Sequence, residues 1–323
     1  MTAAAPAELA AVSPAAKPSR RQIWSLGGGK GGIGKSLLAA SLGYQLARTG
    51  RRVVLVDADL GGSNLHTCLG LEMPALTLGD FLQRRVERIE DVLVETGVPG
   101  LRLVSGASDF LAAANIKHVQ KVRILNKLRG LDVDVVLLDL GAGSSFNIID
   151  FFLISDVSLL TVIPEPTSIE NGYRFIKSAL YRRLRGVAGN EAVRQLVDSA
   201  LDAKNEAGIR TPLDLLRVVG ERHPDAEADM RREVATFHPR FVVNQVRDEA
   251  DQRVGHQLVA ACARHLGVRS SYVGFVPYED AVWRAVRRRR LFMAEAAESR
   301  AADHIRRLTG ALLQGETLPL PWA

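Results

Sequence analysis

The stretch Gly27–Ser36 reads G-G-G-K-G-G-I-G-K-S. It follows a short apolar run, Ile23–Leu26, and it leads into a segment of helical character, Leu37–Leu46. The order strand, glycine loop and helix, with Gly-Lys-Ser closing the loop, fits the pattern G-x-x-x-x-G-K-[ST]. A glycine-rich turn without a ligand would not need a lysine and a serine at this spacing. The stretch therefore predicts a loop that binds phosphate groups.

The chemistry of such a loop follows from its backbone. Glycines let successive N–H groups turn toward one point, and the new helix adds about half an elementary charge of positive potential at its N-terminus. Lys35 can then reach the β- and γ-phosphates, and the Ser36 hydroxyl can ligate Mg²⁺. The nucleotide contacts predicted from this loop are Gly29, Gly31, Gly32, Ile33, Gly34, Lys35, Ser36 and Leu37, whereas a plain phosphate loop does not need the second lysine, Lys30.

Length and composition limit the class of protein. The chain has 323 residues, of which 47% are hydrophobic, so it can bury a core of one large α/β domain or of two domains. Cys68 and Cys262 lie far apart without C-x-x-C spacing, which argues against a disulfide scaffold and an iron–sulfur cluster. No apolar run approaches the roughly 20 residues of a membrane span. We therefore expect a cytoplasmic protein.

Two further apolar strands end in aspartates. Val53–Val56 runs into Asp57 and Asp59, and Val133–Leu138 ends at Asp139 in the sequence D-L-G-A-G. In open parallel sheets, ligands bind at the carboxyl ends of the strands. Beside a phosphate loop, an aspartate at this place holds Mg²⁺, often through water, or faces the attacking water. The alternative is that these carboxylates cap a turn and the helix after it.

Strands alternate with helices through the remaining chain. The further strands are expected at Leu101–Val104, Ser158–Ile163, Arg240–Val246 and Tyr272–Val276. The further helices are expected at Leu76–Val94, Asn115–Arg129, Ile169–Arg185, Asp251–Leu266, Ala281–Arg290 and Ser299–Leu313. This alternation predicts a three-layer α/β/α fold with a mostly parallel central sheet and right-handed crossovers.

Composition divides the chain into four parts. Residues 1–21 are rich in Ala, Pro and Ser and have few large apolar groups, so they are expected to form a disordered leader. Residues 22–313 are expected to form a single domain. Within it, residues 186–239 mix charges and glycine without a buried strand, which indicates a helical insertion. Residues 314–323 include two prolines and are expected to form a loose tail.

Several motifs together resemble those of the MinD/ParA group of deviant-Walker P-loop ATPases: K-G-G-I-G-K-S, D-A-D-L-G-G-S-N, D-L-G-A-G, P-E-P-T-S and V-V-N-Q. The third and fourth motifs, with V-P-Y-E-D-A-V-W-R-A-V-R-R-R-R, are more similar to the FlhG (FleN or YlxH) and MinD branch. The resemblance covers about residues 22–313, apart from the insertion. It implies the P-loop fold, ATP and Mg²⁺.

The resemblance gives roles to residues that match the family's motifs. Lys30 matches the signature lysine, which reaches across a nucleotide-sandwich homodimer to the partner's phosphates. Such a cation resembles an arginine finger, a device worth several orders of magnitude in rate. The alternative is that Lys30 only faces solvent.

Other site residues match the same motifs. Lys35 corresponds to the in-chain phosphate lysine and Asp59 to the carboxylate that orients or activates water, so the expected catalytic residues are Lys30, Lys35 and Asp59. The expected metal-side residues are Ser36, Asp57 and Asp139. The expected adenine contacts are Asn244 and the backbone after Pro277.

The resemblance implies a switch that binds and hydrolyses ATP and so positions or counts a cellular structure, such as a division site or a flagellum. It implies an ATP-bound homodimer, hydrolysis that is slow without an activating protein partner, and a cytoplasmic protein with peripheral contact to the inner membrane or a cell pole. Residues 1–21 carry no D-Q-A-x-x-L-R motif, which argues against the flagellar role.

The alternative function is a ParA-like ATPase that binds DNA without sequence preference during partitioning. It rests on the net charge of +6, the pI near 9.5, and the arginines of Arg182–Arg185 and Arg287–Arg290. Cations also suit a helix C-terminus, which accounts for Arg182–Arg185 without DNA. The stretch that contains Arg287–Arg290 matches one that the resemblance implies to be part of the fold. A third class, the metallocluster carriers, needs bridging cysteines that Cys68 and Cys262 do not match in spacing.

Overall fold

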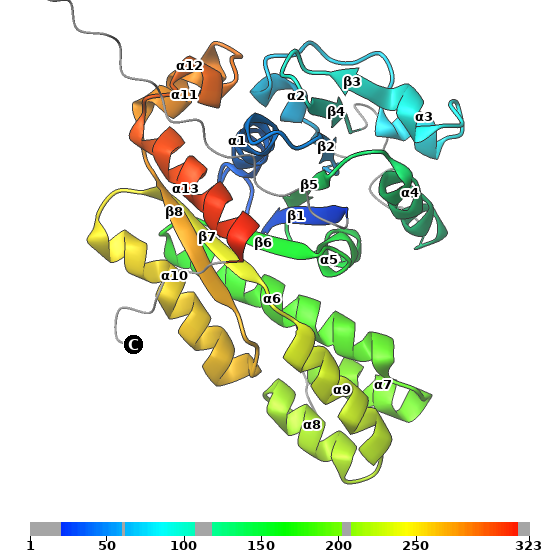
Figure 1. The fold of residues 1–323 in the computed structure, drawn as a ribbon. Coiled ribbons are helices and arrows are strands. Elements are labelled where there is room, and N and C mark those ends of the chain that lie inside the picture. Colours follow the sequence, from blue (N-terminus) through cyan, green and yellow to red (C-terminus); the bar gives the residue numbers. More distant parts are fainter. Residues whose placement is uncertain (1–20, 60–61, 107–117, 202–207, 316–323) are drawn as a thin grey trace, which may run out of the picture.

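A computed structural model describes residues 21–59, 62–106, 118–201 and 208–315. One eight-stranded sheet runs through the molecule, in the order β3-β4-β2-β5-β1-β6-β7-β8 (Figure 1). The strands are β1 (Gln22–Gly28), β2 (Val53–Asp57), β3 (Leu93–Glu95), β4 (Leu101–Val104), β5 (Val135–Ala142), β6 (Val157–Val162), β7 (Arg240–Val246) and β8 (Ser271–Pro277).

The sheet is parallel except at one edge, where the short β3 pairs with β4 in the antiparallel direction. The predicted three-layer α/β/α fold with a mostly parallel sheet is thereby confirmed. The pairing of β2 with β5 sets Asp57 opposite Asp139. The pairing of β1 with β5 sets Leu26, next to the glycine loop, opposite the same Asp139. Strand register therefore brings both aspartates to the loop.

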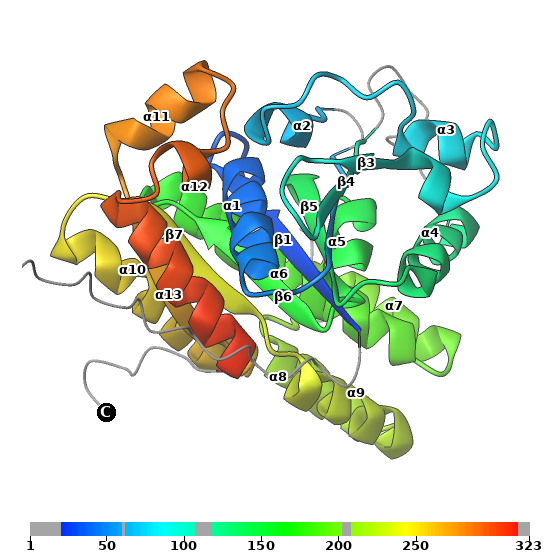
Figure 2. The same cartoon turned by 45° about the horizontal axis from the view of Figure 1, so that its top comes forward.

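Both faces of the sheet are covered, because successive residues of each central strand point into different cores. In β2, Val54 and Val56 belong to one core, while Val53 and Leu55 belong to the other. Helices α4, α5, α6 and α10 cover the first face, and α1, α12 and α13 cover the second (Figure 2). Strands buried on both sides are continuous apolar runs, as the sequence showed.

The helices begin and end close to the expected bounds in most cases. They are α1 (Lys35–Arg48), α2 (Leu65–Cys68), α3 (Leu78–Leu82), α4 (His118–Gly130), α5 (Phe146–Leu153), α6 (Pro166–Val187), α7 (Glu191–Leu201), α8 (Pro212–Gly220), α9 (Pro224–Thr236), α10 (Glu249–Ala261), α11 (Asp280–Arg287), α12 (Phe292–Glu295) and α13 (Arg300–Gln314). A 3₁₀ turn, Ile89–Val92, precedes β3, and a π-helical turn, Cys262–Leu266, follows α10.

The prediction of one helix over Leu76–Val94 is wrong. The segment instead forms α3, the 3₁₀ turn and β3. Arg84 has a φ of 59°, a left-handed conformation that ends a right-handed helix. The apolar spacing reflected burial, since Phe81 and Ile89 are buried, rather than a continuous helix. Helix α5 was not predicted at all.

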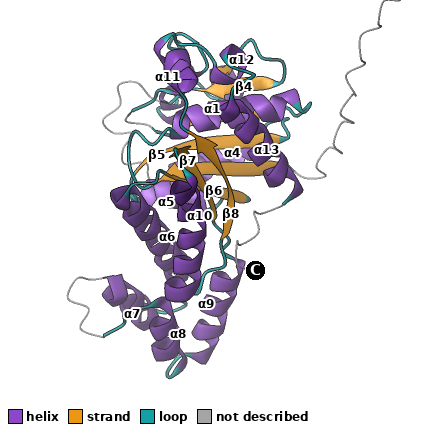
Figure 3. Ribbon diagram, turned by 90° about the vertical axis from the view of Figure 1, so that its left-hand side faces the viewer, coloured by secondary structure: helices purple, strands orange, loops and turns teal. Residues whose placement is uncertain are grey.

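The segment expected as a helical insertion, residues 186–239, contains α7, α8 and α9. Helices α7 and α9 pack with α6, and α8 packs with α7 and α9. All three lie at the opposite end of the molecule from α11 and α12 (Figure 3). The division into domains stays a prediction. Most of the expected leader and tail, residues 1–20 and 316–323, lies outside the described residues. In the described parts of the chain, no helix is both long and apolar enough to cross a bilayer.

The fold makes one prediction about stability. Phe175 of α6 is fully buried, packs edge-on against Phe152 with ring centroids 4.9 Å apart, and lies under Gly27. We expect Phe175→Ala to lower the free energy of unfolding by about 3–5 kcal/mol, because it removes apolar contacts and leaves a cavity. Urea denaturation followed by circular dichroism measures this change. Phe146 is 69% exposed, so Phe146→Ala should change the value by less than about 1 kcal/mol. Equal losses in the two variants would contradict the assignment of the core.

Candidate functional site

The glycine loop between β1 and α1 is shaped by close backbone contacts. A Cβ atom on Gly29 would lie 2.6 Å from the backbone of Asn171, and one on Gly34 would lie 2.4 Å from the side-chain nitrogen of Asn244. Gly34 also has a φ of 86°, which favours glycine over other residues. Both positions therefore exclude larger residues, and the loop curls at the N-terminus of α1.

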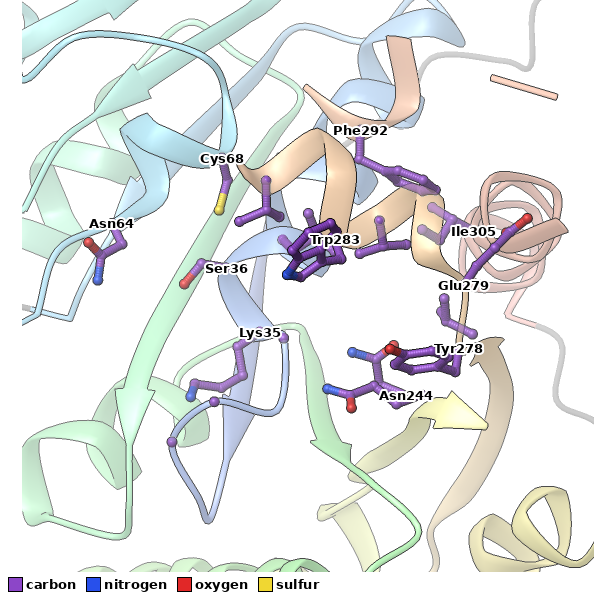
Figure 4. Close-up of a pocket in the computed structure, with 18 of the residues that line it drawn as sticks. Lys35, Ser36, Asn64, Cys68, Asn244, Tyr278, Glu279, Trp283, Phe292 and Ile305 are labelled. Carbon is purple, nitrogen blue, oxygen red and sulfur yellow. The ribbon is translucent and has the colours of Figure 1, made fainter. Parts of the chain in front are cut away.

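A cavity of about 540 Å³ opens beside this loop. In Figure 4, Lys35 and Ser36 lie on one side of the cavity, Tyr278 and Trp283 lie on another, and Asn244 lies between Lys35 and Tyr278. The predicted site residues that line the cavity are Gly31, Gly32, Gly34, Lys35, Ser36, Leu37, Asp59, Asn244 and Pro277. The predicted site residues outside this lining are Gly29, Lys30, Ile33, Asp57 and Asp139.

Asp139 is the most deeply buried carboxylate of the site. Its side chain is 1% exposed, and neither of its oxygens has a hydrogen-bond partner among the described residues. Burial, together with the nearby Asp57 charge, raises the pKa of Asp139 to about 8, although Ser36 and Lys35 oppose the shift. Among the described residues, the Lys35 charge and the Ser36 hydroxyl therefore offset only part of what burial costs this carboxylate.

Asp57, by contrast, is fully engaged within the chain. Its Oδ2 accepts hydrogen bonds from the Ser63 hydroxyl at 2.6 Å and from the Leu65 backbone N–H at 3.0 Å, while Oδ1 accepts one from the Asp59 N–H at 3.1 Å. Burial raises the pKa of Asp57, and these hydrogen bonds partly offset the shift. The structure thus places Asp57 as the acceptor that holds the loop between β2 and α2. Its predicted place near the metal stays a prediction.

Asp59 and Lys35 face the same space. The Asp59 carboxylate lies against Gly141, where a Cβ would stand 3.1 Å from its Oδ1. Lys35 is buried, and its Nζ lies 3.5 Å from the carbonyl oxygen of Lys30. Burial lowers the pKa of Lys35, and the charges of Asp139 and Asp59 oppose that shift. A cation and two carboxylates therefore surround the point that the loop encircles.

Lys30 points away from the cavity beside its own loop. Its Nζ donates to Glu165 Oε2 at 2.8 Å and lies 3.5 Å from the Thr167 hydroxyl, and the ion pair is exposed. Glu165 precedes α6 directly, in the motif P-E-P-T-S. The motif was recognised in the sequence, but the contact of Glu165 with Lys30 spans 135 residues and had no local signal.

Asn244 connects β7 to the loop. Its side-chain nitrogen donates a 2.8 Å hydrogen bond to the carbonyl oxygen of Ile33, and its side chain is buried at the cavity wall. This bond fixes which end of the amide faces the loop. The amide oxygen is therefore the end that remains for a ligand.

The donor set fits a hard divalent cation. Mg²⁺ binds through one or two protein oxygens and keeps several waters. Asp139 offers two buried oxygens without partners among the described residues, and the Ser36 hydroxyl lies close enough to affect the pKa of Asp139. The Lys35 ammonium and the start of α1 add positive potential for phosphate oxygens. The residues present therefore fit Mg²⁺ together with a phosphate chain.

Sequence reasoning missed the apolar side of the cavity. Tyr278, Trp283 and Val286 line it, together with Phe292 and Ile305 from α12 and α13. The stretch V-P-Y-E-D-A-V-W-R-A-V supports the family resemblance, but the resemblance assigns no function to these side chains. A signal existed, because two aromatic residues follow the end of a strand at the same edge as the glycine loop.

The fold and the site together define a P-loop nucleotide-binding protein. A family model described as the CobQ/CobB/MinD/ParA nucleotide binding domain matches residues 24–292. The match spans most of the chain, and the protein belongs to this family. The predicted resemblance to the MinD/ParA group is thereby confirmed.

Two relatives within this family are similar to the chain in sequence. The antiactivator FleN of Pseudomonas aeruginosa is 28% identical over 283 residues, which are 87% of this chain and 82% of FleN. The septum site-determining protein MinD of Helicobacter pylori is 31% identical over 179 residues, which are 54% of this chain and 64% of that protein.

Solved structures show the same fold at lower identity. MinD of Pyrococcus horikoshii, solved in complex with Mg-ADP, has a TM-score of 0.62 at 19% identity. The match covers 91% of this chain and 98% of that MinD chain. A ParA family ATPase of Chlorobium tepidum has a TM-score of 0.59 at 14% identity, over 91% and 99% of the two chains. The architecture is therefore common to the MinD and ParA proteins.

The second prediction concerns how the protonation of Asp139 changes the stability of the protein with pH. The folded chain keeps the Asp139 proton up to a pH of about 8, whereas the unfolded chain releases it near the ordinary value of 3.8. Between these values the unfolded state binds fewer protons, so the free energy of unfolding falls as the pH rises. We expect Asp139→Asn to raise the melting temperature of the ligand-free protein at pH 8. The same change should remove the Mg²⁺-dependent stabilisation by ADP.

Thermal melts at pH 6 and pH 8, with and without Mg-ADP, measure both effects. Asp150→Asn is the matched control, because hydrogen bonds from Arg182 and Lys121 overcome burial and hold the pKa of Asp150 below its usual value. That variant should melt at a lower temperature. An Asp139→Asn protein that melts below wild type at pH 8 would disprove the assignment.

Proposed function

We propose that this protein is an ATP-dependent dimerisation switch that positions or counts a cellular structure. The observation that carries the proposal is the place of the two loop lysines. Lys35 lines the phosphate end of the cavity. Lys30 is not part of the lining and instead forms an ion pair with Glu165. One lysine thus serves the chain's own nucleotide, and the other is held at the surface, where a second copy of the chain can meet it.

The chain's residues divide the chemistry between them. The loop N–H groups and Lys35 bind the phosphates, and Asp59, which lines the same cavity, orients the attacking water. Mg²⁺, when bound, supplies positive charge to the phosphate oxygens. Lys30 of a second copy would add a further cation where negative charge grows in the transition state. Without that copy the site lacks this cation, so we expect the isolated chain to hydrolyse ATP slowly.

The cost of releasing Lys30 is small. Exposed ion pairs such as Lys30–Glu165 contribute about 0–1 kcal/mol. A charge-assisted hydrogen bond to a phosphate contributes more, about 1.5–3 kcal/mol. The balance favours transfer of Lys30 from Glu165 to the nucleotide of a second copy once ATP is present.

The names of the relatives support the positioning role. H. pylori MinD is described as septum site-determining, and H. pylori YlxH, 30% identical over 156 residues, is described as flagellum site-determining. A MinC–MinD complex of Aquifex aeolicus has a TM-score of 0.57 at 22% identity. By analogy, we propose a protein partner that activates hydrolysis, and a cytoplasmic protein in peripheral contact with the membrane. Helices α7–α9 offer a surface that such a partner could recognise.

The third prediction tests the switch. In an Asp59→Ala background, which slows hydrolysis, we expect Mg-ATP to produce a dimer and Mg-ADP to leave a monomer. Adding Lys30→Ala should return the ATP-bound protein to a monomer, because the cation that joins the two sites is gone. Size-exclusion chromatography with light scattering measures the mass. Lys127→Ala, a matched loss of an exposed lysine on α4, should leave the dimer intact. A monomeric Asp59→Ala protein in Mg-ATP would reject the proposal.

The orientation of Asn244 supports adenine as the base. Its nitrogen is committed to the Ile33 carbonyl, so its oxygen is the group left to face a base. Adenine presents an amino group at position 6, which donates a hydrogen bond to that oxygen. Guanine presents a carbonyl oxygen there, and two acceptors would repel each other. We therefore propose that ATP is preferred over GTP.

The fourth prediction concerns this selection. We expect ADP to bind at least about 5-fold more tightly than GDP, since a buried mismatched acceptor costs about 1–3 kcal/mol. Asn244→Ala should weaken ADP and bring the two affinities within a few-fold of each other. Asn64→Ala removes a different asparagine that lines the same cavity, so it is the control and should leave the ratio of the ADP and GDP affinities unchanged. Competition with a fluorescent ADP analogue measures both ratios. A wild-type protein that binds GDP as well as ADP would contradict the role of Asn244.

The DNA-binding alternative has weaker support. In the cluster Arg182–Arg185, the three arginines form ion pairs with Asp150, Glu233 and Asp198. Those arginines are therefore engaged within the chain. The alternative rests on Arg287–Arg290, where all four arginines are exposed and Arg288 pairs with Glu295. The protein switch is the better supported of the two functions.

A further inference from the structure

Apolar side chains at the end of β8 and on helix α11 line the nucleotide cavity, although α11 also packs on the core. Among the described residues, eight large apolar side chains are exposed, and three of them, Tyr278, Trp283 and Val286, line this cavity. Trp283 is the most exposed of the three, at 57%, while Ala285 of the same helix is fully buried. Apolar side chains gathered in this way mark a binding surface.

The cavity has a polar end and an apolar end. Lys35 and Ser36 lie at the first, and Tyr278 and Trp283 lie at the second. A nucleotide has the same division, because its phosphates are charged and its base is a flat, largely apolar ring. Since the glycine loop fixes the phosphates at the polar end, the base falls toward the aromatic side chains.

An arginine lies over each of the two rings. The guanidinium carbon of Arg247 is 4.1 Å from the ring centroid of Tyr278, and that of Arg287 is 5.2 Å from the ring centroid of Trp283. Cation–π contacts of this kind orient an exposed ring. Both rings also remain partly exposed, Tyr278 at 46% and Trp283 at 57%, so each keeps surface that a planar ligand can contact.

We propose that Trp283 forms the wall on which the nucleotide base packs, and that it sets the affinity for the base while Asn244 selects its identity. The proposal rests on the nucleotide-binding function proposed above and assigns a residue of α11 to it. It also makes α11 responsive to the nucleotide, because the ring that packs on the base is the ring that holds Arg287.

Binding of two probes tests the proposal. Isothermal titration calorimetry with Mg-ADP should show a dissociation constant that is roughly 5- to 150-fold higher for Trp283→Ala than for wild type, the range expected for one lost base–aromatic stack. Trp283→Phe should recover most of the affinity. Inorganic tripolyphosphate with Mg²⁺, which has no base, should bind wild type and Trp283→Ala equally. Leu213→Ala on α8, a matched loss of an exposed apolar side chain, should change neither constant.

Tryptophan fluorescence gives a second readout. Trp24 is fully buried in the core, so it supplies a constant background. ADP should change the emission of wild type and tripolyphosphate should not, and Trp283→Phe should remove the ADP response although Trp24 and Trp322 remain.

Three outcomes would overturn the proposal. Wild-type ADP affinity in Trp283→Ala would show that the ring does not touch the base. Equal weakening of ADP and tripolyphosphate in that variant would show a structural role instead. A wild-type protein that binds neither probe would refute the nucleotide-binding function itself. If wild type binds both probes and Trp283→Ala weakens only ADP, the result supports the role of Trp283.

Discussion

Three ionisable side chains are buried side by side where β2, β5 and α1 meet: Asp57, Asp139 and Lys35. Burying a charge costs several kcal/mol unless partners replace its water. Asp57 obtains such partners from Ser63 and Leu65, and Lys35 lies between carboxylates and a backbone carbonyl. Asp139 lacks a hydrogen-bond partner among the described residues. The ligand-free site therefore carries an electrostatic cost that a hydrated divalent cation would remove, so folding and ligand binding are linked at one carboxylate.

That arrangement depends on strand register. Asp57 and Asp139 face each other because β2 and β5 pair in one register, and a slip of a single residue would turn each side chain to the other face of the sheet. The two cores enforce the register, since each strand has apolar groups on both sides. Phe175 contributes directly, because it lies under Gly27 at the base of the loop. Core packing thus decides where the charged side chains lie.

The sequence predicted which residues lie at the edge of the sheet better than it predicted the contacts that their side chains make. Apolar runs ending in aspartate placed Asp57, Asp59 and Asp139 correctly at one edge, because strand ends of a parallel sheet converge. Which of these carboxylates is already satisfied depends on Ser63 and Leu65, whose geometry has no periodic signal. Spacing likewise recorded the burial of residues in 76–94 but not the left-handed Arg84 that interrupts the helix. The Lys30–Glu165 pair joins distant segments and follows only from the folded chain.

The Lys30–Glu165 contact has a consequence at the level of the cell. If each copy must surrender its own pair and receive a lysine from the other, the exchange is reciprocal and needs two loaded molecules at once. At low occupancy the number of such encounters rises with the square of the protein's concentration. On the proposed switch, the engaged form would therefore respond to the local concentration of the protein as well as to ATP, and more steeply than in proportion to that concentration.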